Sequence, residues 1–189
     1  PDEAFITREM GKGADGSVLG MAAVGVVAVS MIFFILAVSL VSWVAIDHGV
    51  LSGGIGLWRA CIQGECMGLD EPSTELQVTR ACVILSIISS FAASVCLAKG
   101  QRKTRLLTTG VGAAFAAGLC GVISMAVYVD WTSEDIGQEG FSYGAAFALN
   151  IVAWLGCLLA GGLGLISNAS TQGLEAPLIA HDQPRSVYC

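Results

Sequence analysis

The residues of this chain best suited to chemistry lie in one polar stretch, GLWRACIQGEC, residues 56–66. Cys61 and Cys66 are five positions apart, and two thiols in one segment can form a disulfide or contribute to a metal site. A structural zinc site needs four ligands, and His48 is the one histidine nearby. The pair therefore favours a disulfide over zinc.

The same stretch has the pattern of a short β-hairpin. If Gln63 and Gly64 form a two-residue turn, Cys61 faces Cys66 in the second pair from the turn, where opposite side chains approach most closely. A disulfide spans that distance. Trp58 is expected to pack on the hairpin near the membrane surface. Two interpretations stay open: a covalently fixed recognition element, or a disulfide that merely holds a small sheet together.

Other reactive groups are sparse. The two histidines, His48 and His181, lie outside the apolar runs, and no nucleophile–base pair, HExxH motif or phosphate loop is present. The acidic residues lie in loops and tails, and no basic face is available for nucleic acid. The sequence indicates neither an enzyme nor a nucleic-acid-binding protein, and it calls for no metal or cofactor.

Four long apolar runs must position the hairpin. Charged residues make up 13% of the 189 residues, whereas soluble domains carry roughly a quarter. Each run has about the ~20 residues needed to cross ~30 Å of hydrocarbon, the second being the shortest. No ionisable Asp, Glu, Lys, Arg or His lies within a span, which argues against transporters, pumps and intramembrane enzymes. The expected helices are 20–44, 81–98, 106–129 and 143–166.

The loop of residues 99–105 predicts the orientation in the membrane. It carries four Lys and Arg residues and no acid, and short basic loops stay in the cytoplasm. Both termini are then cytoplasmic, and loops 45–80 and 130–142 are extracellular. The cysteine pair lies on the oxidising side, where disulfides persist. A multi-pass plasma-membrane protein is expected.

Polar segments flank the expected transmembrane domain of residues 20–166. Residues 1–19 are predicted to form a cytoplasmic segment, and residues 167–189 a disordered cytoplasmic tail. The last four residues, SVYC, loosely fit a ligand of a PDZ-type scaffold, against the alternative of an uncommitted tail. Cys96, beside the basic loop, is a candidate for palmitoylation.

Small residues follow two of the expected helices at four-residue spacing. Lipid tails do not drive apolar helices together, so close backbone packing at small residues must do so. These stripes either pack helices within the bundle or form a lateral interface with another protein. Asn150 is expected to hydrogen-bond inside the bundle. The stripes are Gly112, Ala116, Cys120 and Ser124 in the third helix, and Gly156, Ala160 and Gly164 in the fourth.

The order of motifs between and beyond the first two helices resembles the claudin superfamily. That group includes the peripheral myelin protein, the epithelial membrane proteins, the lens fibre membrane intrinsic protein, the claudins and the calcium-channel gamma subunits. The pattern is most similar to the myelin–epithelial–lens branch. The resemblance is carried by Trp43, by Gly56-Leu57-Trp58, by Cys61 and Cys66, by Arg80 in LQVTRA, by SMAVY at 124–128 and by FSYG at 141–144.

The resemblance implies a left-handed bundle of four transmembrane helices, capped by a small disulfide-stapled extracellular β-sheet from the first loop. It implies that Trp43, Gly56, Leu57, Trp58 and Arg80 act in that extracellular element. The first loop is short for a paracellular pore. A role in cell–cell contact, adhesion or membrane organisation remains, through self-association or partner proteins. The alternative is an auxiliary subunit of an ion channel or receptor.

Overall fold

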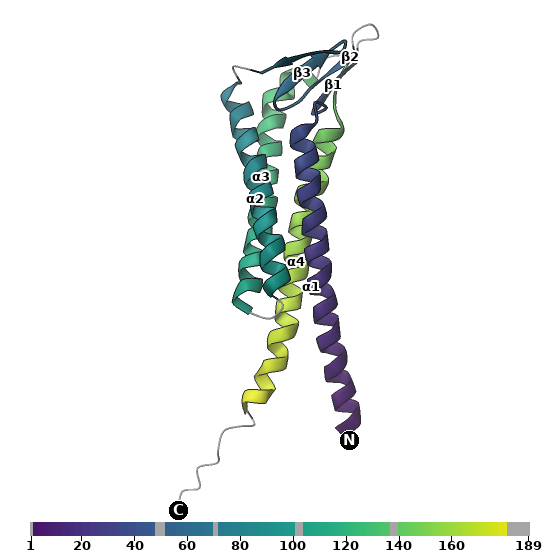
Figure 1. Ribbon diagram of the computed structural model, residues 1–189, viewed down its shortest axis with the longest axis vertical. Coiled ribbons are helices and arrows are strands. Elements are labelled where there is room, and N and C mark those ends of the chain that lie inside the picture. The colour runs from purple at the N-terminus through teal and green to yellow at the C-terminus, as the bar shows by residue number, and fades with distance from the viewer. Residues whose placement is uncertain (1, 48–51, 70–71, 101–103, 137–139, 181–189) are drawn as a thin grey trace, which may run out of the picture.

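A computed structural model describes residues 2–47, 52–69, 72–100, 104–136 and 140–180 (Figure 1). Four helices run side by side: α1 (Asp2–Ser39), α2 (Thr74–Gly100), α3 (Thr104–Ile136) and α4 (Ala145–Ala180). Within these residues, four segments are long and apolar enough to cross a membrane: Val18–Ser39, Thr74–Gly100, Arg105–Ser133 and Ala145–Ala169. The start of α1 and the end of α4 lie at the end of the bundle opposite the sheet (Figure 1).

The helices associate most extensively in two pairs, α1 with α4 and α2 with α3 (Figure 1). Small side chains fill much of the bundle interior, which lets helix backbones approach closely, as packing in a bilayer requires. The fully buried alanines are Ala23, Ala37, Ala93, Ala114, Ala117, Ala146, Ala153 and Ala160.

A five-stranded sheet covers one end of the bundle (Figure 1). Four strands lie between α1 and α2, and the fifth lies between α3 and α4. The strand order is β4-β3-β2-β1-β5, and every neighbouring pair is antiparallel. The predicted four-helix fold with a disulfide-stapled sheet is confirmed. The strands are β1 (Val44–Asp47), β2 (Ser52–Ile55), β3 (Arg59–Ile62), β4 (Glu65–Gly68) and β5 (Phe141–Tyr143).

The ends of two helices next to the sheet differ from the prediction. The first helix was expected at 20–44, but α1 ends at Ser39, and the Trp43 N–H already donates to the Ile55 carbonyl over 3.0 Å. The fourth was expected from residue 143, but Tyr143 pairs with Val44 in the sheet. An apolar run does not distinguish a helix from a short buried strand, so hydropathy extended both helices too far.

The remaining helix ends also extend beyond the predicted ones. Helix α2 begins at Thr74 rather than 81, α3 extends into the expected loop 130–142, and α1 includes residues 2–19 of the expected segment 1–19. Residues 167–180 are helical rather than disordered. Polarity marks where a helix leaves the hydrocarbon and does not by itself end the helix; α4 continues to Ala180 even through Gly173 and Pro177. The PDZ-type ending and residues 101–103 of the basic loop lie outside the described residues.

Candidate functional site

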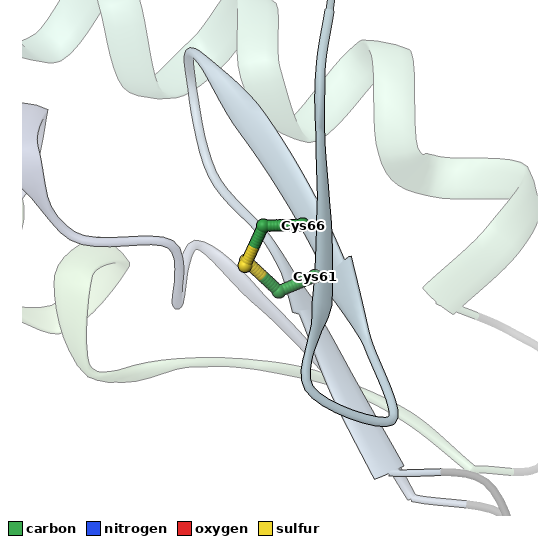
Figure 2. The surroundings of a disulfide bond; sticks show 2 residues. All are labelled: Cys61 and Cys66. Atoms are coloured by element: carbon green, nitrogen blue, oxygen red, sulfur yellow. A yellow bond between two sulfur atoms is a disulfide. The ribbon is translucent and has the colours of Figure 1, made fainter.

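Strands β3 and β4 form the hairpin that carries the cysteine pair. Cys61 lies directly opposite Cys66 in the strand register, and a disulfide joins them over a Cα–Cα distance of 4.0 Å. Figure 2 shows the bond crossing between the two strands near the hairpin turn. The predicted disulfide and the predicted register are both confirmed.

The turn of this hairpin has an uncommon backbone conformation. Gln63 has φ 54° and Gly64 has φ 87°, so both residues are in the left-handed region. Two-residue hairpin turns of this kind match the twist of the flanking strands. Glycine adopts such a φ without cost, but glutamine rarely does. The Gln63-Gly64 sequence favours this turn only in part. The disulfide, in the second residue pair from the turn, therefore restricts the other conformations that the turn could adopt.

Replacing Cys66 with serine is expected to lower delivery of the protein to the cell surface severalfold. The closed loop is short, so the loss of stability should be about 2 kcal/mol, near the low end for a native disulfide. Helix content, measured by circular dichroism, should stay unchanged because the helices do not depend on the bond. Cys120→Ser, at a free and half-buried cysteine of α3, is the control. Equal surface delivery of the two variants would contradict the prediction.

Gly56 and Leu57 fix the corner between β2 and β3 onto the bundle. A Cβ at Gly56 would lie 2.7 Å from the Val41 Cα and 2.8 Å from the Leu40 carbonyl oxygen. Those are backbone atoms that cannot move aside cheaply, so the corner requires glycine. The Leu57 side chain is fully buried. The corner therefore inserts into the end of the bundle that the sheet covers.

Arg80 ties helix α2 to this corner. Its Nε donates a hydrogen bond to the Leu57 carbonyl over 2.7 Å. Its guanidinium carbon lies 4.6 Å from the centroid of a Trp58 ring, within the range of a cation–π interaction. One arginine thus holds both the backbone of the corner and its exposed aromatic side chain.

Trp43 anchors the base of β1 in the interior. It is fully buried, and its Nε1 donates to the Ala37 carbonyl over 2.7 Å. That bond satisfies a carbonyl near the end of α1, where the helix can no longer do so. The ring centroid lies 4.8 Å from that of Tyr128 and 6.2 Å from that of Phe147. Trp43 therefore joins α1, α3 and α4 beneath the sheet.

These positions divide the five residues that the resemblance assigns to the extracellular element into buried and exposed ones. Trp43, Gly56 and Leu57 are buried, and Arg80 is half-buried. Trp58 is the one of the five with a large exposed fraction, 45%. Burial of the first three beneath and within the corner gives them a structural role, since a partner cannot reach them.

The exposed apolar side chains of the hairpin were not singled out in the sequence. Ile62 is 42% exposed and Met67 is 71% exposed. Opposite residues of an antiparallel pair point to the same face, so Ile62 and Met67 share one face, while Arg59 and the disulfide share the other. Once the register was predicted, alternation along the strands would have identified this pair. All four residues of β4, an edge strand, are exposed.

The two predicted small-residue stripes lie on different surfaces. Ala160 and Gly164 are buried, and a Cβ at Gly164 would lie 2.7 Å from the Val111 Cγ2. A Cβ at Gly156 would overlap the Ser30 Oγ. Gly112 and Ala116 are exposed, and no atom lies within 4 Å of a Cβ built on Gly112. The α4 stripe thus packs inside the bundle. The half of the α3 stripe that is farther from the sheet, Gly112 and Ala116, faces away from the other helices.

Asn150 lies fully buried in α4 and contacts the neighbouring helix. Its Nδ2 donates to the Ser124 Oγ over 3.4 Å, and that hydroxyl donates to the Gly121 carbonyl over 2.7 Å. The Asn150 Oδ1 is buried without a hydrogen-bond partner among the described residues. The side chain therefore links α4 to α3 inside the bundle.

The described residues were searched for clusters of metal-binding side chains. Within them, no group of three or more His, Cys, Asp or Glu side chains is placed to hold a metal ion. Cys96 is a free, half-buried thiol whose Cβ lies 3.1 Å from a Cβ built on Gly110 of α3. Its palmitoylation stays a prediction.

The chain was compared with known protein families and with individually curated proteins. The model of the PMP-22/EMP/MP20/Claudin family matches residues 17–164, which include all four apolar spans up to Gly164 and the whole sheet. No curated protein matches. Since the match covers most of the chain and agrees with the bundle, the sheet and the disulfide, the chain belongs to the PMP-22/EMP/MP20/Claudin family.

Proposed function

We propose that this tetraspan membrane protein organises cell–cell contacts, with the outer sheet binding a protein on the opposing membrane. The observation that carries the proposal is the exposed apolar pair Ile62 and Met67 on a disulfide-locked hairpin. Exposed apolar side chains on a rigid support are typical of protein-binding surfaces. In this proposal the protein lies in the plasma membrane with both termini in the cytoplasm, as the basic loop favours.

The orientation of the hairpin supports this proposal. Arg59, on the other face of β3, lines a groove with Val41 and Ile84 at the outer end of α1 and α2. Ile62 and Met67 therefore point away from that groove. Arg80 and the buried Leu57 fix the strand to the bundle, so few degrees of freedom are lost when a partner binds.

Reconstitution into two differently labelled vesicle populations tests the proposal. The wild-type protein is expected to enrich at contacts between the vesicles, and Met67→Asp to lower that enrichment by roughly thirtyfold, because interface hot spots contribute about 2 kcal/mol. Ser133→Asp adds the same charge at an exposed position of α3 away from the hairpin, and it should behave as wild type. Failure of the wild type to enrich would reject trans adhesion.

An auxiliary-subunit role is the second candidate, and the outward-facing Gly112 and Ala116 of α3 favour it. Small residues on a membrane-exposed helix face let another helix approach closely. In this case the chain should co-purify stoichiometrically with a larger membrane protein in mild detergent, and Gly112→Leu should abolish that association. Co-purification without vesicle enrichment would select this candidate over adhesion.

A further inference from the structure

A groove of about 310 Å³ lies where the sheet meets the outer ends of α1 and α2. Its lower wall is mainly apolar: Val38, Leu40 and Val41 at the end of α1 and Ile84 of α2 line it, together with the one polar residue Ser39. Trp58 and Arg59, from the β2–β3 corner and β3, form the upper wall. The groove therefore has an apolar part and a part with an aromatic ring and a cation.

The groove lies at the level where the outer leaflet meets water. Val38 is the penultimate residue of the apolar span Val18–Ser39, and Leu40 is the first residue after that span. Ile84 is nearly three turns inside the α2 span and is 40% exposed. Because α1 packs mainly on α4 and α2 mainly on α3, the seam between α1 and α2 is more open than the seams within the pairs. The groove is thus accessible from the lipid.

The upper wall is positively charged and has no acidic partner among the described residues. Arg59 is exposed, and no ion pair to a described carboxylate involves it or Arg80. The Arg80 guanidinium stacks on Trp58, and its Nη2 is buried without a hydrogen-bond partner in the described part of the chain. One guanidinium, that of Arg80, thus stacks on the indole, and a second, that of Arg59, lines the groove beside it, in a chain of net charge −6. An anionic group is the complementary ligand.

We propose that this groove binds a phospholipid of the outer leaflet. The phosphate accepts charge-assisted hydrogen bonds from Arg59, beside the Trp58 ring, which suits the headgroup region. The start of one acyl chain lies against Val38, Leu40 and Ile84. The occupant fits both halves of the groove, since a free anion would leave the apolar wall uncovered and a hydrocarbon would leave Arg59 unpaired. The lipid would sit between the bundle and the corner that carries the hairpin. The proposal does not depend on adhesion.

Native mass spectrometry of the detergent-purified chain, titrated with dioleoyl phosphatidylglycerol, tests the site. Arg59→Gln removes the cation at an exposed position, and Ile84→Trp fills the apolar part without changing charge. Each substitution is expected to raise the dissociation constant of the first bound lipid about tenfold. Arg59→Gln loses one charge-assisted hydrogen bond, and Ile84→Trp loses the apolar contact with the acyl chain. Dioleoylglycerol, which has the same chains and no phosphate, should bind the wild type about tenfold more weakly than the phospholipid.

Arg105→Gln is the matched control, because Arg105 is an exposed arginine at the opposite end of the bundle. It should bind the phospholipid as the wild type does. Equal weakening by Arg59→Gln and Arg105→Gln would mean general attraction of anionic lipid to surface charge and would overturn the proposal. Unchanged binding by either Arg59→Gln or Ile84→Trp, or equal binding of dioleoylglycerol, would overturn it as well.

Discussion

Replacing Trp43 with alanine is expected to lower the free energy of unfolding by about 3–5 kcal/mol, the usual cost of truncating a fully buried aromatic side chain. The indole fills the space between α1, α3 and α4, where its ring contacts Tyr128 and Phe147. Its loss opens a cavity and leaves the Ala37 carbonyl without its donor. The measurement is thermal or denaturant unfolding of the purified protein in detergent, followed by near-ultraviolet circular dichroism.

Trp58→Ala is the natural control for this experiment. Both residues are tryptophans at the end of the bundle that the sheet covers. Trp58 is 45% exposed, however, whereas Trp43 is fully buried. Its removal deletes a cation–π contact with Arg80, which contributes about 0.5–1 kcal/mol at exposed sites. Equal destabilisation by the two substitutions would show that burial of Trp43 beneath the sheet is not what stabilises the outer end of the bundle.

Gly164→Leu is expected to destabilise the bundle by about 1–3 kcal/mol, the typical cost of overpacking. A Cβ at this position would already lie 2.7 Å from the Val111 Cγ2 and 3.4 Å from the Leu97 Cδ2. The leucine would force α4 away from α2 and α3, and the helix contacts around it would weaken. A lower midpoint of thermal unfolding in detergent, with unchanged helix content at low temperature, is the expected result.

Gly162→Leu, two positions away on the same helix, separates crowding from the general effect of replacing glycine. No heavy atom lies within 4 Å of a Cβ built on Gly162, so the added side chain meets open space on the lipid side. Its unfolding midpoint should match or slightly exceed that of the wild type, because glycine is a poor helix former. A midpoint reduced as far as that of Gly164→Leu would refute steric crowding at the inner face.

Hydropathy and charge were sufficient to predict the four spans, because crossing hydrocarbon imposes a length and a composition that few other structures share. The hairpin register could also be predicted, since a two-residue turn at Gln63-Gly64 determines which residues face one another. Both features depend on local rules that act within a short window of sequence.

The inward or outward direction of the stripes could not be predicted from spacing. Residues four apart share a helix face, but nothing in that period says whether the face meets another helix or lipid. Ala160 faces the bundle interior and Gly112 faces away from it, although both belong to stripes with the same spacing. The burial of Trp43 was missed similarly, because it depends on contacts with Tyr128 and Phe147, both more than eighty positions away in sequence.

The fifth strand imposes an order on biogenesis. The β3–β4 hairpin closes within a few residues, so its disulfide can form as soon as this segment has been synthesised. Strand β5 pairs with β1 only after the chain has been synthesised through α3, and the Gly144 N–H then donates to the Trp43 carbonyl at the start of α4. An unpaired β1 edge therefore persists until the first three helices and β5 itself have been synthesised.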